Sequence, residues 1–387
     1  MDFTIPYELK DMVNSLKKFL NNEVRPIAQA NHSDDGYISE EVRKKVRLRS
    51  RELGFYGADF PEDCGGMGLS NLGMVLLREE VGRAGTELGD AVFGEAGALS
   101  TILLECNEEQ KEKYLLPAVR AEKLSCFALT EPNAGSDAGS IETKAVRDGD
   151  HFILNGRKHF ISNAIYADFA IVFTVTDKAK RGITCFLVDR GTPGFIQGPV
   201  QKHIGGGDRI GELLFEDCRV SEKNVLGKVD QGFIYALKRV GEGRVRLAAQ
   251  FLGIAERLLQ MCIDYSKERV QFGKPICRNQ AIQWMLTDMS VDIQATKMML
   301  YHAAWKRDQG KDIVREASMV KLFSSEMLGR AADKAVQIYG GMGLMKECPI
   351  EAVYRHVRVA RIGEGTSEIQ RRLIARFLLD SGPLTMD

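Results

Sequence analysis

The sequence predicts an α+β protein in three blocks: an N-terminal helical domain at residues 1–123, a middle β domain at 124–231, and a C-terminal helical bundle at 232–387. In the first and last blocks, apolar residues recur every three or four positions, the period of a helix with one buried face. In the middle block, short runs of β-branched and aromatic residues are separated by Gly, Pro and Asp clusters. Helices and strands do not alternate, which excludes a doubly wound nucleotide-binding fold as the main architecture.

The first block is predicted to begin with an amphipathic helix that ends at Pro26. The expected buried face consists of Leu9, Met12, Val13, Leu16, Phe19 and Leu20. A second helix is indicated by Ser39, a favoured N-cap residue, and by the acidic Glu40 and Glu41 in the first turn. Gly54 is expected just past the end of this second helix.

The middle block is predicted to contain a β-hairpin. Two β-prone runs flank Asn155-Gly156, the dipeptide preferred in a two-residue type I′ turn. Further strands are expected at AIVFTV, TCFLV and ELLFEDCRV. From Gly232 the helical period returns, with breaks at 273–275, at 310 and at 340–349, which indicates an antiparallel bundle of four long segments with short connections.

Composition and charge narrow the classes of function. The 387 residues suffice for two or three packed regions, and the formal net charge of +0 without a basic stripe disfavours nucleic-acid binding. No stretch approaches the ~20 apolar residues that span a bilayer. The N-terminal segment has no signal-peptide or Arg-rich leader pattern, so we expect a cytoplasmic, bacterial protein, with a mature mitochondrial form as the alternative. The eight cysteines and six histidines lack metal-ligand spacing, so no metal site is expected.

Phosphate-binding and nucleophile motifs such as GxxxxGK[ST], GxSxG and GxGxxG after a strand are absent from the sequence. Two other segments carry suitable polar groups. Residues 129–137 are rich in Pro, Gly and Ser, so their backbone N–H groups and hydroxyls can bind the rim of a planar cofactor; an ordinary β-loop is the alternative. Arg269 ends a long helix, where it can bind a pyrophosphate in a bidentate manner or only complement the helix C-terminus.

A third segment, at 362–370, places a carboxylate between two glycines. Thr366 or Ser367 can cap the helix that follows, with Glu368 in its first turn. Capping does not require an acid between the two glycines. Glu364 is therefore a candidate for chemistry.

In this order and on this three-block plan, the segments resemble the acyl-CoA dehydrogenase family. The resemblance covers almost the whole chain and extends to FPEDCGGMGLSNL, EEQKEKYLLP, LNGRKHFIS and QIYGGMGL. It implies a helical domain, a middle β-barrel or β-sandwich domain and a C-terminal four-helix bundle, assembled as a homotetramer. It also implies FAD as cofactor, an acyl-CoA substrate and an electron-transferring flavoprotein as electron acceptor.

The resemblance implies α,β-dehydrogenation of the acyl-CoA thioester. Glu364 matches the base that removes the α proton while the β hydrogen leaves as hydride to flavin N5. The peptide N–H of Glu364, with a flavin ribityl hydroxyl, would bind the thioester carbonyl as an oxyanion hole. Some relatives carry the base on the first bundle helix, at the position matching Gly243; Glu242 is one residue off, so it is a distant alternative to Glu364.

The resemblance also implies the residues of two binding sets. The FAD set consists of Phe127, Leu129, Thr130, Ser136, Phe160, Ile161 and Ser162, of Arg269, Phe272, Gln280, Gln337, Gly340 and Gly341 from a neighbouring subunit, and of Thr366 and Glu368. The CoA- or acyl-contacting set consists of Ser136, Arg244, Gly363, Gly365 and Arg376. For the two phenylalanines Phe160 and Phe272, core packing is the alternative.

Two positions depart from the family pattern. Asn133 stands where relatives usually have Gly, and Gly363 stands where many have an aromatic residue. Loss of that side chain beside the reacting carbons widens the acyl pocket, which favours a short branched, cyclic or aryl-substituted acyl group. An oxidase, a flavin monooxygenase or an enoyl-CoA reductase on the same fold remains an alternative, and so does a non-catalytic CoA-binding protein.

Overall fold

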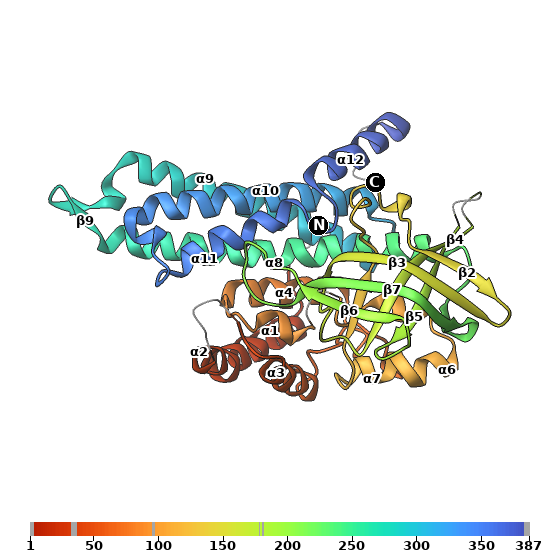
Figure 1. Cartoon of the computed structure of the whole chain (residues 1–387). Coiled ribbons are helices and arrows are strands. Elements are labelled where there is room, and N and C mark those ends of the chain that lie inside the picture. Colours follow the sequence, from red (N-terminus) through yellow and green to blue (C-terminus); the bar gives the residue numbers. More distant parts are fainter. Residues whose placement is uncertain (1–3, 32–36, 95–96, 178, 180–181, 383–387) are drawn as a thin grey trace. The chain divides into compact units, whose positions relative to one another are not determined.

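The computed structural model describes residues 4–31, 37–94, 97–177, 179 and 182–382. Its element order is helical, then β-rich, then helical, which confirms the predicted α+β class (Figure 1). The chain forms two compact units, one of Met1–Arg25, Ser70–Gly89 and Gly241–Asp387, and one of Pro26–Leu69 and Asp90–Val240. We call them the bundle unit and the β unit. The predicted domain boundaries at 123/124 and 231/232 stay predictions.

The bundle unit is organised around three long helices. These are α8 (Gly232–Glu268), α9 (Gln280–Asp308) and α10 (Val314–Tyr339), followed by the shorter α11 (Pro349–His356) and α12 (Ser367–Ser381). The part of α8 up to Val240 belongs to the β unit. Its core is rich in small residues, such as the fully buried Ala248, Ala304 and Ala332. Small core side chains let helices approach closely along their length. Within the part of the chain that the structure covers, no helix meets the length and hydropathy needed to cross a membrane.

The N-terminal helices differ from prediction in one respect. α1 (Tyr7–Phe19) buries Leu16 and Phe19 as expected, but the chain continues through a π-helical turn, Leu20–Val24, into α2 (Arg25–Ala30). The prediction that Pro26 ends the helix is therefore wrong. Pro26 has no N–H to donate. The π turn just before it, in which the Arg25 N–H donates to the Leu20 carbonyl oxygen, absorbs the change of register.

Helix α4 (Asn71–Ala84) packs directly on α8. A Cβ at Gly253 would lie 1.9 Å from the Glu79 carbonyl oxygen, and a Cβ at Gly82 would lie 2.3 Å from the Gln250 carbonyl oxygen. Both distances are far below contact distance, so only glycine permits this approach of the two backbones. The contact fixes α8, which carries one of the site residues described below.

The β unit is built on an eight-stranded sheet of order β6-β7-β3-β2-β4-β5-β8, with β1 parallel to β4. The strands are β1 (Ser125–Ala128), β2 (Lys144–Asp148), β3 (His151–Ser162), β4 (Phe169–Asp177), β5 (Gly182–Asp189), β6 (Phe195–Val200), β7 (Ile210–Ser221) and β8 (Val225–Leu226). The three strand runs predicted after the hairpin lie in β4, β5 and β7 and are confirmed. Both faces of β4 are buried, and its side chains alternate between two apolar clusters. Phe169, Ile171 and Phe173 lie in one, and Ala170 and Val172 lie in the other.

Helix α3 and three short helices belong to the β unit, apart from Gly89, the first residue of one short helix, which belongs to the bundle unit. α3 (Glu40–Glu52) begins at Ser39, whose hydroxyl accepts from the Val42 N–H, and Gly54 follows it with a φ of 83°. Both predictions for this helix are confirmed. The short helices are α5 (Gly89–Val92), α6 (Glu108–Gln110) and α7 (Leu116–Val119).

The predicted hairpin at Asn155-Gly156 is wrong, because β3 runs through this dipeptide as one strand. β3 pairs with β2 on one edge and with β7 on the other, and its register against β7 shifts between Leu154 and Gly156. Between these two pairs, β7 has two residues, Glu216 and Asp217, opposite the single Asn155 of β3, so the β-bulge lies on β7. Gly156 has a φ of 150°, and a Cβ there would lie 2.5 Å from the Thr143 Oγ1. Glycine is thus required for a close approach and not for a turn.

A small hairpin, β9 (Val270–Gln271) and β10 (Lys274–Pro275), joins α8 to α9 at the end of the bundle opposite α12 (Figure 1). At its turn, Phe272 has a φ of 51° and is 99% exposed. The last turn of α10 reaches the same end, because the rings of Tyr265 and Tyr339 stack with centroids 4.0 Å apart. We call this end the bundle tip.

Candidate active site

Glu364 lies on a strained turn between a 3-10 segment, Val357–Arg361, and α12. Its φ is 55° and that of Gly365 is 93°, so two consecutive residues are left-handed. A left-handed conformation is uncommon for glutamate and costs on the order of 1–3 kcal/mol. The turn ends at Thr366, whose Oγ1 accepts from the Ile369 N–H at 3.2 Å, which confirms the predicted helix cap. We call residues 363–366 the Glu364 turn.

Three side chains hold the carbonyl oxygens of the Glu364 turn. The Arg244 Nε donates to the Glu364 carbonyl oxygen at 3.3 Å. The Gln370 Nε2 donates to the Glu364 oxygen at 3.2 Å and to the Gly365 oxygen at 3.0 Å. The Lys321 Nζ donates to the Gly365 oxygen at 2.5 Å. A Cβ at Gly365 would lie 2.7 Å from the Gln370 Nε2, so glycine is needed there for space as well as for φ.

The three donors are buried, and two of them are cationic. Lys321 and Gln370 are 0% exposed and Arg244 is 7% exposed. Burial, followed by the charge of Arg244, lowers the pKa of Lys321 to about 8, against the opposing effects of Glu364 and Glu368. Burial also lowers the pKa of Arg244, and Glu364 partly offsets that effect. Positive charge therefore surrounds the backbone of the turn that carries the proposed base.

The alternative base and the last contact residue each take part in an ion pair. The Glu242 carboxylate is 3.8 Å from the Arg307 guanidinium, so its environment is an ion pair on the bundle. Arg376 is exposed on α12 and lies 3.5 Å from the Asp380 carboxylate. We call the three donors to the turn, Arg244, Lys321 and Gln370, the clamp. Sequence reasoning does not identify Lys321 and Gln370. The roles assigned to Arg244, Gly363, Gly365 and Arg376 stay predictions.

In the β unit, the structure brings together two segments of the predicted FAD set. The His159 N–H donates to the Thr130 carbonyl oxygen at 2.9 Å, which joins the 129–137 loop to the end of β3. One residue further along β3, Phe160 is left-handed with a φ of 56° and is 64% exposed. Its exposed ring beside exposed loop backbone and the exposed Ser136 suits contact with a planar, polar-rimmed group.

A buried ion pair fixes this loop to the strand. The Lys158 Nζ lies 2.7 Å from the Glu131 Oε1 and 3.2 Å from the Leu129 carbonyl oxygen. Glu131 also accepts the backbone N–H groups of Glu142 and Thr143, at 2.6 and 3.0 Å. Burial lowers the pKa of Lys158 to about 8, although Glu131 opposes the shift. The loop is thus anchored at both sides of Thr130.

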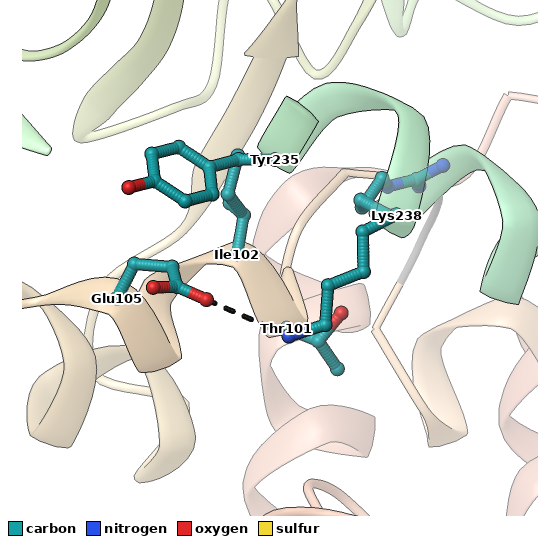
Figure 2. A pocket seen from close by; sticks show the side chains of 6 residues that line it. Thr101, Ile102, Glu105, Tyr235 and Lys238 are labelled. Carbon is teal, nitrogen blue, oxygen red and sulfur yellow. Dashed lines mark ion pairs between the residues drawn. The ribbon is translucent and has the colours of Figure 1, made fainter. Parts of the chain in front are cut away.

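Phe127 and a small pocket lie close together in the β unit. The Phe127 ring packs 5.0 Å from the Phe173 ring, and the Arg239 guanidinium lies 5.0 Å from its centroid. Arg239 also lines the pocket in Figure 2, in which Lys238 and Glu105 form an ion pair at 3.5 Å. The pocket holds about 10 Å³, roughly the space of one water molecule. It is too small to be a cofactor site.

The bundle residues of the predicted FAD set fall into two groups. The first group is exposed at the bundle tip and consists of Arg269, Phe272, Gln280, Gln337, Gly340 and Gly341. Thr366 and Glu368 lie at the Glu364 turn, which Lys321 contacts from α10. Gln337 is 16 residues beyond Lys321 on α10, which is about 24 Å of helix. One chain therefore presents the two groups at separate ends of its bundle.

Comparison with known proteins gives consistent matches along the chain. Models of acyl-CoA dehydrogenase N-terminal, middle and C-terminal domains match residues 6–122, 126–218 and 230–379. A 3-(aryl)acrylate reductase of Clostridium sporogenes is 40% identical over 98% of this chain and 100% of its own. The caffeyl-CoA reductase-Etf complex subunit CarC of Acetobacterium woodii is 39% identical over 89% and 92%. The structure of butyryl-CoA dehydrogenase from Megasphaera elsdenii has a TM-score of 0.88 at 36% identity and covers 98% of this chain and 100% of its own.

Proposed function

Because the chain belongs to the acyl-CoA dehydrogenase family of FAD-dependent oxidoreductases, we propose that it interconverts an acyl-CoA thioester and its α,β-unsaturated form with Glu364 as the base. The observation that carries the proposal is the Glu364 turn, where a carboxylate sits on a left-handed backbone held by buried donors. The start of an ordinary helix does not require a strained turn held by buried donors. A base that must approach an α carbon in one orientation requires such fixed positioning.

The residues of the turn have separate tasks in this proposal. The Glu364 carboxylate takes the α proton, and the Glu364 peptide N–H donates to the thioester oxygen, where negative charge develops. FAD, when bound, accepts the β hydrogen with its electron pair. The clamp supports this arrangement from the C-terminal side, because it holds the two peptide planes that follow Glu364.

The predicted FAD residues are supported by the local structure on both units. Phe160 offers an exposed ring beside the anchored 129–137 loop, and Arg269 offers an exposed cation at the bundle tip. We assign the ring-side contacts to the loop and a phosphate contact to Arg269. Since the tip and the Glu364 turn of one chain lie about 24 Å apart along α10, we assign the tip contacts to a second copy, in a homotetramer. This assignment makes FAD retention depend on assembly.

For the substrate, Gly363 supports a wide acyl pocket. A Cβ built at Gly363 would have the Val359 carbonyl oxygen as its nearest neighbour, at 3.9 Å. The turn therefore leaves room at this position, where a side chain would stand beside the reacting carbons. We propose a short branched, cyclic or aryl-substituted acyl group, with an electron-transferring flavoprotein as redox partner; the name of the A. woodii relative supports the partner.

Reduction of an enoyl thioester is the second candidate function. It is favoured by the two relatives named as reductases, one of them for a 3-(aryl)acrylate. The same residues would act in reverse, with Glu364 returning the proton to the α carbon. Anaerobic assays with reduced and oxidised electron-transferring flavoprotein, on 3-phenylpropionyl-CoA and cinnamoyl-CoA, separate the two directions by their initial rates. Hydrogen peroxide formation in air would instead indicate an oxidase.

The experiment that tests the base is Glu364→Gln, with Glu242→Gln as the matched control. We expect Glu364→Gln to fold and to bind FAD but to lose at least about a thousand-fold in kcat, because the amide cannot accept the α proton. Glu242→Gln should stay within about three-fold of wild type. Turnover with an artificial electron acceptor and flavin absorbance after desalting measure both points. A yellow Glu364→Gln enzyme with near-wild-type turnover would overturn the assignment.

A further inference from the structure

Lys321 is the fully buried lysine of the clamp on the Glu364 turn. It lies on α10 and is 0% exposed. An ammonium group removed from water is strongly destabilising unless partners replace the water. Its Nζ donates to the Gly365 carbonyl oxygen at 2.5 Å. A buried charge is thus placed against the backbone of the residue that follows Glu364.

The hydrogen bond from Lys321 to the Gly365 oxygen acts on one peptide plane of the Glu364 turn. The Gly365 oxygen belongs to the peptide plane between Gly365 and Thr366, just after the two left-handed residues. The plane before it is held at the Glu364 oxygen by Arg244 and Gln370. These two planes flank Gly365, so holding both of them restricts the left-handed conformation of the residue that follows the base. Loss of Lys321 would leave the Gly365 oxygen to the neutral Gln370 Nε2, which donates to it at 3.0 Å, and would weaken this constraint.

We propose that Lys321 is a positioning residue that holds the Glu364 turn in its left-handed conformation through the Gly365 carbonyl, and so orients both the base and the N–H that binds the thioester oxygen. This inference rests on the proposed function of Glu364. Lys321 itself touches neither substrate nor flavin in this account. Its effect therefore appears in the rate of proton removal and not in the binding of CoA.

The contact should depend on pH. The charged groups that face Lys321 are Arg244 from α8, Glu364 from the turn and Glu368 from α12. Burial and Arg244 lower the pKa of Lys321 to about 8, so the ammonium loses its proton as the pH rises through that value. A neutral amine donates a weaker hydrogen bond than an ammonium. We expect kcat to fall above about pH 8, with an alkaline limb that belongs to Lys321.

The test compares Lys321→Met and Lys321→Arg with Lys311→Met, which removes a lysine from an exposed position between α9 and α10. For Lys321→Met we expect kcat to fall about ten-fold or more, the loss typical of a hydrogen bond to a charged group, with KM and FAD content within about two-fold of wild type. The limb near pH 8 should disappear in Lys321→Met. Lys311→Met should keep both the rate and the limb.

Further readouts apply if Lys321→Met loses FAD or does not fold. Lys321→Arg keeps a cation at all accessible pH values, so its pH profile decides: the limb must be absent while kcat below pH 8 stays within about three-fold of wild type. Exchange of the substrate α proton with deuterated solvent gives a measure of proton removal that does not require net turnover. Wild-type kcat and an unchanged pH profile in Lys321→Met, or a persistent limb in Lys321→Arg, would overturn the inference.

Including Glu364→Gln in the series separates this inference from the proposed function. If Glu364→Gln retains turnover, the proposed function fails, and Lys321 then has no base to position. If Glu364→Gln is inactive while Lys321→Met behaves like wild type in rate and pH profile, only the positioning role fails. An inactive Glu364→Gln with the expected Lys321→Met profile supports both.

Discussion

Removal of the cation from the buried pair Lys158–Glu131 should destabilise the β unit strongly. Lys158 is 0% exposed and the Glu131 side chain is 4% exposed. In Lys158→Met, the Glu131 carboxylate would stay buried without its counter-ion, and the Leu129 carbonyl oxygen would lose a donor. Breaking a buried pair from one side costs about 3–5 kcal/mol. At about 2–4 °C per kcal/mol for a unit of this size, the midpoint of thermal unfolding should fall by about 6–20 °C.

The double variant Lys158→Met/Glu131→Gln separates the charge effect from packing. It removes the uncompensated carboxylate, so its cost should be smaller than that of Lys158→Met alone. The substituted amide would keep one acceptor oxygen for the two N–H groups that Glu131 now binds, so one of them would lose its partner, at about 1–3 kcal/mol. The two substitutions should therefore be strongly non-additive, with a coupling of at least about 1 kcal/mol.

The assay is thermal unfolding followed by far-UV circular dichroism, at fixed protein and FAD concentrations because bound ligand raises the midpoint. Flavin absorbance after desalting is measured on the same samples, since the pair anchors the 129–137 loop. Lys144→Met, which replaces an exposed lysine on β2, is the control. A midpoint in Lys158→Met within about 2 °C of wild type, or strictly additive losses, would refute the claim that the pair holds the loop.

Two further outcomes are expected from the proposed cofactor and acyl sites. Arg269→Ala should weaken FAD retention by about 1.5–3 kcal/mol, the contribution of a charge-assisted hydrogen bond; flavin absorbance after dialysis measures it, Gln271→Ala on the same hairpin is the control, and equal retention would contradict the phosphate contact. Gly363→Tyr should lower kcat/KM for a cyclohexanoyl thioester about ten-fold or more, as overpacking costs about 1–3 kcal/mol, with less effect on a butyryl thioester. An equal loss on both thioesters would remove the wide-pocket interpretation.

The sequence predicted those parts of the fold that local rules control. The caps at Ser39 and Thr366 follow from side-chain hydrogen bonds within one turn, and both are present. The dipeptide Asn155-Gly156 was misassigned because Asn-Gly is typical of a tight turn, whereas this glycine serves a close approach to Thr143 within a strand. The choice between them depends on β2 and β7, which pair along both edges of β3, and such pairing is not local information.

For the site too, the sequence predicts residues that local patterns mark and misses residues that only tertiary contacts bring together. Glu364 could be singled out because an acid between two glycines has no structural explanation nearby in the sequence. Arg244 could be placed only by resemblance, as a CoA or acyl contact, whereas the structure shows it bonded to the Glu364 carbonyl oxygen. Lys321 and Gln370 complete that clamp from α10 and α12. The clamp is a tertiary arrangement, so no single segment reveals it.

A signal for the buried lysines was nevertheless present in the sequence. Lys321 shares the buried stripe of α10 with Ala317, Ser324 and Leu328, at the spacing of three and four that marks a helix face. Lys158 likewise stands in the inward register of β3. Lysine is almost never fully buried without a partner. A lysine at a position that the helix or strand period buries therefore predicts a buried hydrogen-bond acceptor. In this protein each acceptor lies on a loop that the proposed chemistry uses.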